Sequence, residues 1–192
     1  MRKRTSWADR QCCSTIAQRS WRVHSPQGHA DTMPAPSADL TIDLTALDID
    51  DLLREWRWRV PKDYRPIQMT KFGDSFFADA KEQVHMPDLI EGTLQEVAPS
   101  IGAYKELKDT PDKQNEWFLD SLVFRCAESD VLLDSSQCYG WEVHPLLGGK
   151  LTIDNIKVYS LRVYQSIMGQ IFRQYQNHKL GDPLPFIKIN PR

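Results

Sequence analysis

The strongest hydrophobic pattern in the chain lies near its C-terminus. Apolar side chains recur there at the i, i+3, i+4 and i+7 positions expected for one face of a helix: Leu161, Tyr164, Met168, Ile171, Phe172 and Tyr175. The hydroxyl of Ser160 can cap the start of this helix, and Gly181 suits its exit. We therefore predict a long amphipathic helix over this stretch.

Two further helices are indicated by capping residues and apolar spacing. Thr45 begins a T-A-L-D sequence that resembles a capping box, and apolar positions follow at helical intervals, which predicts a helix over 46–58. Thr110 followed by Pro111 is a typical helix entry, and the apolar positions after it predict one helix running to about residue 128. A short helix fits between them, over 100–109.

The intervening segments are typical of strands. Four short runs rich in apolar residues are separated by polar breaks: 67–72, 75–80, 84–90 and 93–98. Such close spacing predicts an antiparallel meander, with Pro87 at an edge or a bulge because proline has no N–H to donate. We predict two more strands, over 138–144 and 153–159, with a turn at 145–149. The fold class is therefore α+β, an antiparallel sheet meander packed against helices in a single domain with a long C-terminal helix.

Composition divides the chain into two parts. Residues 1–36 lack a hydrophobic period and begin with a strongly basic stretch, so we predict a disordered leader. The alternative is that translation of the protein begins at Met33, which would place residues 1–32 upstream of the start. Residues 37–192 form the predicted α+β domain and are acidic overall. No apolar run approaches the roughly 20 residues of a membrane span, and the cysteine spacing matches neither a disulfide framework nor a zinc site. These features favour a cytoplasmic protein without a membrane contact.

The sequence carries no pattern of an active site. Gly149-Lys150 lacks the remaining residues of a phosphate-binding loop, the histidines lack metal-ligand spacing, and no serine stands in G-x-S-x-G. We therefore predict no catalytic residue, no cofactor and no metal, and hence not an enzyme. A hydrolase that uses His144 or Asp88 stays open as a further hypothesis.

Acidic side chains are concentrated in two runs, 39–55 and 74–96, the second with six acids and one base. Such charge sorting favours an encounter with a basic protein and disfavours binding to nucleic acid phosphates. Trp58 falls two positions after Trp56, on the opposite side of a helix, so we expect Trp56 in the core and Trp58 exposed or beyond the helix end. The candidate partner-binding residues are Asp74, Asp79, Glu82, Asp88, Glu91 and Trp58.

Four segments resemble the C-terminal domain of the DNase-immunity proteins of bacterial type VI secretion. They are KFGDSFF (71–77), DLIEGTL (88–94), CYGWEVHPLLGG (138–149) and QSIMGQ (165–170). The resemblance covers roughly residues 52–190. It implies a cytosolic protein that binds a cognate toxin, a DNase, and blocks the substrate site of that toxin.

The shared motif residues are interpreted as structural, because glycines at turns and aromatic residues on one side of a strand serve folding. They are Gly73, Tyr139, Trp141, His144, Pro145, Gly148 and Gly149. The alternative function is a non-enzymatic regulatory or ligand-binding module with a domesticated immunity fold. An adjacent gene for a secreted nuclease would favour immunity over this alternative.

Overall fold

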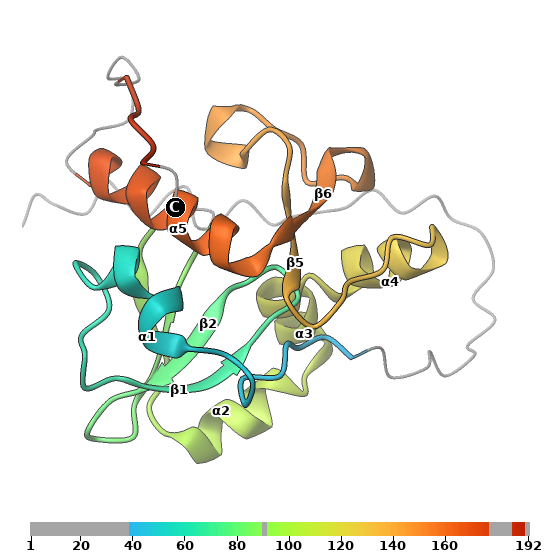
Figure 1. The fold of residues 1–192 in the computed structure, drawn as a ribbon. Coiled ribbons are helices and arrows are strands. Elements are labelled where there is room, and N and C mark those ends of the chain that lie inside the picture. The colour runs from blue at the N-terminus through green and yellow to red at the C-terminus, as the bar shows by residue number, and fades with distance from the viewer. Residues whose placement is uncertain (1–38, 90–91, 177–185, 191–192) are drawn as a thin grey trace, which may run out of the picture. The chain divides into compact units, whose positions relative to one another are not determined.

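A computed structural model describes residues 39–89, 92–176 and 186–190 of the chain. Within them, four strands form an antiparallel sheet in chain order, β1-β2-β3-β4 (Figure 1). The strands are β1 (Arg65–Met69), β2 (Ser75–Ala78), β3 (Val84–Pro87) and β4 (Leu94–Ala98). This order confirms the predicted meander. The predicted leader, 1–36, lies outside the described residues.

A separate antiparallel hairpin follows later in the chain. It consists of β5 (Gln137–Trp141) and β6 (Ile156–Ser160). One main-chain hydrogen bond ties it to the end of the sheet, from the N–H of Tyr139 to the carbonyl oxygen of Lys71 at 2.8 Å. The hairpin leads directly into the long C-terminal helix, so its position also sets where that helix begins.

Helical segments surround the strands. They are α1 (Ile49–Leu52), η1 (Arg54–Trp56), α2 (Ile101–Lys108), α3 (Pro111–Phe118), α4 (Asp120–Glu128), η2 (Pro145–Leu147), η3 (Ile153–Asn155) and α5 (Leu161–Tyr175). The described residues therefore form a single α+β domain with a long C-terminal helix, as predicted. No helix in this part of the chain combines the length and apolar character needed to cross a membrane.

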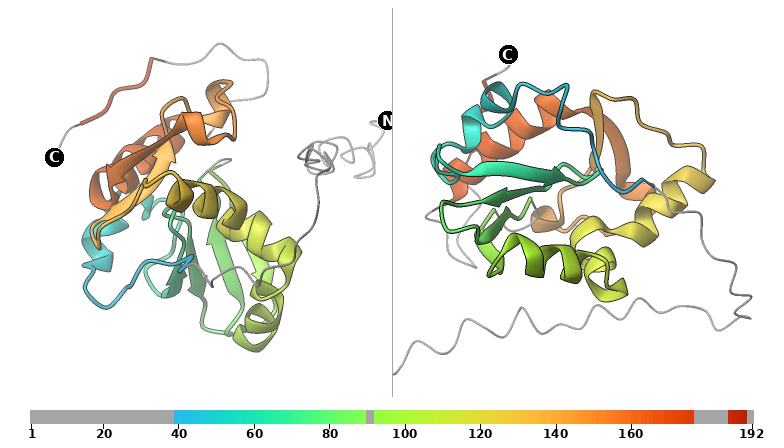
Figure 2. Two further views of the ribbon diagram at one scale, coloured as in Figure 1. Left: turned by 90° about the vertical axis from the view of Figure 1, so that its right-hand side faces the viewer. Right: turned by 90° about the horizontal axis from the view of Figure 1, so that it is seen from below.

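The four-stranded sheet has a helical layer on each face, as the right-hand view of Figure 2 shows. Adjacent residues of a strand point to opposite faces. Phe77 accordingly packs with Trp56 and residues of α5, whereas Phe76 packs with Tyr104 of α2 and Trp117 of α3. A third cluster joins Phe72 to the hairpin and α4. The sheet thus separates an α5 side from an α2–α3 side.

The predicted helix over 46–58 is wrong in both extent and cap. It is replaced by the single turn α1 and the 3-10 turn η1, and the first free N–H groups are capped by Asp48, which accepts from the N–H of Asp51 at 3.0 Å. The hydroxyl of Thr45 instead donates to Asp43. The 3-10 turn η1 ends at Trp56, so Trp58 lies beyond its end. This position was one of the two alternatives predicted for Trp58.

The predicted helix from Thr110 to residue 128 is two helices. Leu119 interrupts it with a left-handed conformation, at φ +50°. The break has a packing reason, because Trp117 before it contacts the sheet cluster and Leu122 after it contacts the hairpin cluster. Pro111 occupies the first helical position as predicted, but the Thr110 hydroxyl bonds back to the carbonyl of Leu107 instead of capping.

Several predicted strand ends shift. Pro87 ends β3, which is an inner strand, and the nearby register irregularity falls between Val84 and His85, so the prediction of an edge or bulge at Pro87 is wrong. Residues 153–155 form η3 before β6 begins. Ser160 holds the N-cap position of α5 without a side-chain hydrogen bond. The predicted exit residue Gly181 lies outside the described residues.

Candidate functional site

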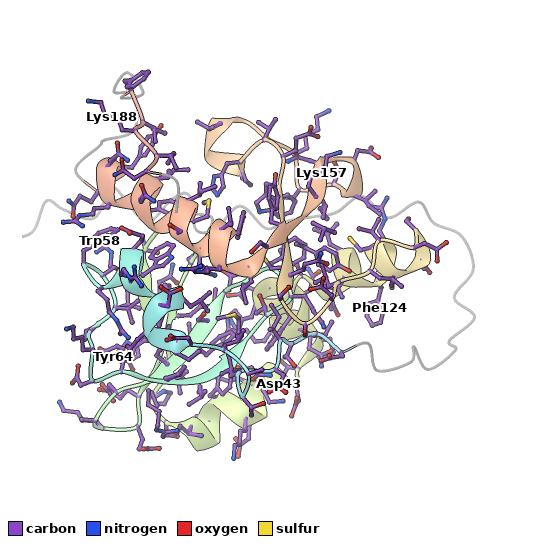
Figure 3. The ribbon with its side chains drawn as sticks, viewed as in Figure 1. Asp43, Trp58, Tyr64, Phe124, Lys157 and Lys188 are labelled. Carbon is purple, nitrogen blue, oxygen red and sulfur yellow. The ribbon has the colours of Figure 1, made fainter. Side chains whose placement is uncertain are left out.

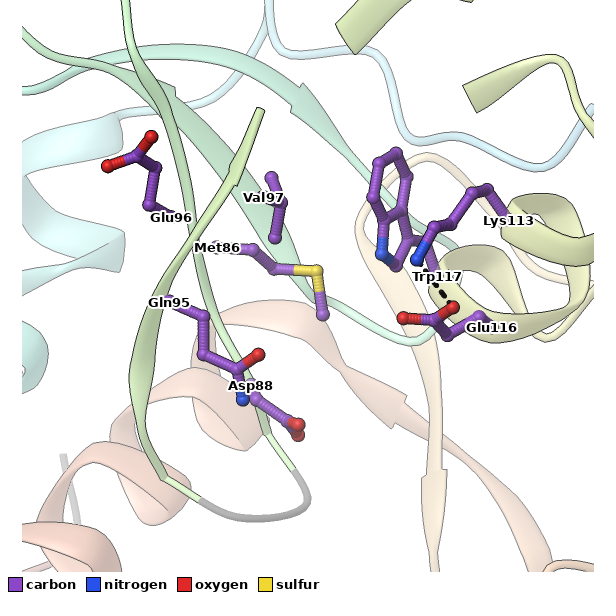
Figure 4. Close-up of a pocket in the computed structure, with 8 residues that line it drawn as sticks. All are labelled: Met86, Asp88, Gln95, Glu96, Val97, Lys113, Glu116 and Trp117. Carbon is purple, nitrogen blue, oxygen red and sulfur yellow. Dashed lines mark hydrogen bonds and ion pairs between the residues drawn. The ribbon is translucent and has the colours of Figure 1, made fainter. Parts of the chain in front are cut away.

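A pocket of about 220 Å³ opens between β3, β4 and α3 (Figure 4). Its walls are partly apolar and partly charged. Strand residues supply one side and helix α3 supplies the other: Met86, Asp88, Gln95, Glu96, Val97, Lys113, Glu116 and Trp117. We call this feature the acidic pocket. The acidic runs of the sequence include the strand side of this pocket, within 74–96, but not its helical side.

Aromatic packing positions the helical wall of the acidic pocket. The ring of Trp117 is buried, and its centroid lies 5.6 Å from that of Phe76 and 5.8 Å from that of Tyr104. Contacts of this kind fix the angle between α3 and the sheet. On the opposite wall, Met86 faces Gln95 across the β3–β4 pair. The pocket therefore has a preformed apolar floor.

The charge of the acidic pocket is unbalanced. Two carboxylates, on Asp88 and Glu116, line it together with one ammonium group, on Lys113. The side chain of Glu96 points away from it, because Glu96 alternates with Gln95 and Val97 along β4 (Figure 4). Lys113 pairs with Glu116 at 2.7 Å and lies 5.0 Å from the centroid of the Trp117 ring. The pocket thus has a net charge of −1 and already holds one cation against its aromatic wall.

The loop next to the pocket is anchored by two titratable side chains. Asp74 accepts the main-chain N–H of Leu89 at 3.0 Å, and Nε2 of His144 bonds to the carbonyl oxygen of Leu89 at 2.9 Å. Burial, together with the neighbouring carboxylate of Asp88, raises the pKa of Asp74 to about 8. Burial also lowers the pKa of His144. Since a carbonyl can only accept, Nε2 carries the proton of a neutral imidazole.

The motif residues that carried the family resemblance meet inside the fold. The side-chain amide of Gln165 donates to the carbonyl oxygen of Gly73 at 2.6 Å. The main-chain carbonyl of Gln165 accepts from the indole N–H of Trp56 at 3.1 Å. Tyr139 and Trp141 lie on the same side of β5 and pack against the ring of Phe72. Such contacts stabilise the domain interior.

The turn after β5 explains the remaining motif residues. Pro145 begins η2, Gly148 has a φ of +86°, and a Cβ at Gly149 would lie 1.7 Å from the carbonyl oxygen of Val143. Only glycine fits position 149 without a shift of the main chain. Glycine also adopts the positive φ of position 148 more easily than any other residue. These glycines close the turn that brings His144 to Leu89.

The predicted partner-binding residues differ in burial and in the contacts that their side chains make. Asp74 is buried with 8% of its surface exposed, so its carboxyl group is not available at the surface. Asp79 accepts from the N–H groups of Lys81 and Gln83 and thereby caps the β2–β3 turn. Glu82 is exposed and forms a 3.2 Å salt bridge with Arg65.

Of the remaining candidates, Asp88 alone lines the acidic pocket. Glu91 lies outside the described residues. Trp58 is partly buried, with the guanidinium group of Arg59 4.8 Å from the centre of its ring. It packs with the cluster on the α5 side of the sheet, beside α1 (Figure 3), so the structure does not bring it to the pocket.

The other acidic run, 39–55, is largely neutralised within the chain. Asp50 pairs with Arg57, and Asp51 pairs with Arg54 and Arg162. Sequence reasoning missed the contribution of α3 to the acidic pocket, because Glu116 and Trp117 fall outside both acidic runs. The only available signal was that Glu116 stands next to an aromatic residue on a helix.

The cysteines in the described part of the chain lie in the interior of the domain. Cys126 and Cys138 are buried free thiols, and burial raises the pKa of each. No group of three metal-ligating side chains occurs in the described ranges. What the arrangement provides is a single α+β domain with an acidic, partly apolar pocket.

Comparison with known proteins relates part of this domain to a family. Residues 98–172 match the family model described as T6SS immunity protein Tdi1, C-terminal. The match supports a type VI secretion immunity protein family for this chain and confirms the resemblance seen in the motifs. It includes the helical wall of the acidic pocket and the 138–149 motif, whereas the motifs at 71–77 and 88–94 precede it.

Two other comparisons complete the picture. The search of curated proteins found no match. Among solved structures, the crystal structure of Atu4351 from Agrobacterium tumefaciens is 14% identical, with a TM-score of 0.43 and coverage of 63% of each chain. The chain therefore spans less than two thirds of the length of that protein.

Proposed function

We propose that this type VI secretion immunity protein neutralises a cognate nuclease toxin by binding it in the cytoplasm and covering its DNA-binding cleft. It does so as a binding protein, without catalysis of its own. The observation that carries the proposal is the acidic pocket. A nuclease must present basic side chains to hold DNA phosphates, and an inhibitor that covers them gains from matching negative charge.

The pocket suits a lysine or arginine side chain of the toxin. Met86 and Val97 offer apolar contacts to the methylene stem of such a residue, and the carboxylates of Asp88 and Glu116 are available to meet its charge. Lys113 already illustrates this chemistry within the chain, because its ammonium group lies near the Trp117 ring and pairs with Glu116. A toxin cation adds to that arrangement without breaking it, since the pocket keeps one negative charge in excess.

The test is a charge-removing double substitution in the full-length chain. Asp88→Asn with Glu116→Gln keeps side-chain shape and removes both carboxylates that face the pocket. The matched control is Glu106→Gln with Glu128→Gln, at two exposed positions on α2 and α4. The partner is the secreted protein encoded beside this gene, and binding is followed by stopped-flow mixing at low and high salt.

We expect the pocket variant to associate about tenfold more slowly than the control at low salt, with a smaller difference at high salt. Equal rates for both variants would remove the pocket from the interface. Degradation of plasmid DNA by the toxin, with and without the immunity protein, tests the nuclease assignment separately. A toxin that binds but leaves DNA intact would overturn that assignment alone.

A further inference from the structure

A second binding arrangement lies on α5, away from the acidic pocket. Two glutamines one helical turn apart, Gln170 and Gln174, contact the main chain of the C-terminal residues 188–190. The amide of Gln170 donates to the carbonyl oxygen of Asn190 at 3.2 Å and accepts from the Asn190 N–H at 2.8 Å. The amide of Gln174 does the same with Lys188, at 2.9 and 3.0 Å.

The spacing of the two elements matches. Residues four apart on a helix are separated by about 6.0 Å along its axis. Alternate residues of an extended segment are separated by about 6.6–6.8 Å. Gln170 faces Asn190 and Gln174 faces Lys188, so the segment runs antiparallel to α5. Each side-chain amide therefore acts as a strand residue would in an antiparallel ladder.

The glutamine side chains are held ready for this role by the helix itself. The second N–H of Gln170 points to the hydroxyl of Ser166 at 3.2 Å, and that of Gln174 to the carbonyl oxygen of Gln170 at 3.0 Å. Gln170 is also buried, with 8% of its surface exposed. These contacts fix the direction of both amides, which lowers the entropy lost when a segment binds.

The occupying segment is suited to the same geometry. Asn190 precedes Pro191 in the sequence, which restricts it to an extended backbone. Among the side chains of the segment, Phe186 is 86% exposed and Lys188, labelled in Figure 3, is also exposed, whereas Ile187 is partly buried. All four hydrogen bonds between the two glutamine side chains and the segment involve main-chain atoms of the segment. The hydrogen bonding is therefore independent of the segment's side chains.

We propose that Gln170 and Gln174 form a binding site for extended polypeptide main chain, which the C-terminal segment of this chain occupies. The ligand class is an extended peptide with a free N–H and carbonyl at alternate residues. A segment of another protein chain with those groups exchanges with residues 188–190. This site is independent of the charge of the acidic pocket and of the proposed toxin.

Hydrogen exchange in the full-length protein gives the first test. The N–H groups of Lys188 and Asn190 are expected to be protected in the wild type. Gln174→Ala, at an exposed position, removes both bonds to Lys188 and should speed exchange of its N–H about tenfold. Gln176→Ala, at a neighbouring exposed glutamine, is the matched control and should leave the protection unchanged. Unchanged protection in Gln174→Ala would overturn the site.

A peptide experiment then tests exchange. The full-length variant Lys188→Pro with Asn190→Pro lacks both N–H donors and vacates the site. A fluorescent peptide of residues 185–192 should bind this variant and not the wild type, and adding Gln174→Ala should abolish that binding. A peptide with alanine at the exposed positions 186 and 189 should bind within about threefold of the native peptide, because the hydrogen bonds involve only main-chain groups.

Two outcomes would overturn the exchange. One is that the native peptide fails to bind the vacated variant. The other is that the alanine-substituted peptide loses binding, which would assign recognition to side chains. A peptide carrying Lys188→Pro and Asn190→Pro serves as the negative control and should not bind.

Discussion

The main-chain N–H of Leu89 donates a 3.0 Å hydrogen bond to Asp74, fifteen residues earlier in the chain. This contact joins the end of β3 to the turn before β2 and places a carboxyl group in the interior. On its other side, the carbonyl of Leu89 meets His144. One buried residue is thus held between two titratable groups, and both make the stability of the protein depend on pH.

We expect Asp74→Asn to reduce the pH dependence of stability between about pH 4 and pH 8. The folded pKa of Asp74 is about 8, above its ordinary value of 3.8, so the folded state binds the extra proton in this window. Its contribution is full below pH 3.8 and falls as pH rises through the window, by up to about 1.4 kcal/mol per pH unit. Asparagine keeps an oxygen to accept from Leu89 and cannot ionise.

The measurement is urea unfolding of wild type and Asp74→Asn at pH 5.0, 6.5 and 8.0. The variant should gain stability relative to wild type as pH rises. Asp63→Asn, at an exposed turn position, is the control and should follow the wild type. Parallel curves for wild type and Asp74→Asn would show that Asp74 is ionised throughout.

His144→Ala should destabilise the protein by about 1–3 kcal/mol at pH 7.5, because the buried carbonyl of Leu89 loses a donor. Burial lowers the folded pKa of His144 below its ordinary 6.5, so the contribution of the neutral imidazole is present above pH 6.5 and declines as pH falls. The cost of the substitution should therefore be smaller at pH 5.5. Chemical denaturation at both pH values measures it, and an equal or larger cost at pH 5.5 would contradict the neutral state.

Gly148 and Gly149 provide a matched pair for testing the turn. Gly148→Ala introduces only backbone strain, since no atom lies within 4 Å of the new Cβ, and should cost about 1 kcal/mol. Gly149→Ala would press a methyl group against the carbonyl of Val143, which requires a main-chain shift and about 2–3 kcal/mol. Thermal melting of both variants ranks them. The reverse order would show that the turn rearranges.

Trp56 and Trp58 should differ in their contribution to folding. Trp56 is 1% exposed and bonds to Gln165, so Trp56→Ala should cost about 3–5 kcal/mol. Trp58 is partly buried beyond the end of η1, and Trp58→Ala should cost about 1–2 kcal/mol. Urea unfolding compares the two directly. A larger cost at Trp58 would mean that the core lies on its side of the turn.

The short-range pattern of the sequence was enough to predict the elements with strong periodicity. The apolar face of α5 and the four short strands follow from spacing and polar breaks, because an antiparallel meander needs only neighbouring segments to pair. The resemblance in the motifs also predicted the family whose model matches residues 98–172. Element ends were less accurate, since Thr45 and Thr110 each had the right chemistry for a cap and use their hydroxyl groups elsewhere.

Only the tertiary structure decided the break at Leu119 and the fate of the acidic side chains. No glycine or proline at position 119 indicates a helix break in the sequence. Leu119 adopts its left-handed conformation because α3 packs in one hydrophobic cluster and α4 packs in another. In the sequence Asp74 and Asp88 carry the same charge. Packing buries the first beneath α5 and leaves the second at a pocket with Glu116, because burial depends on which distant segments cover a residue.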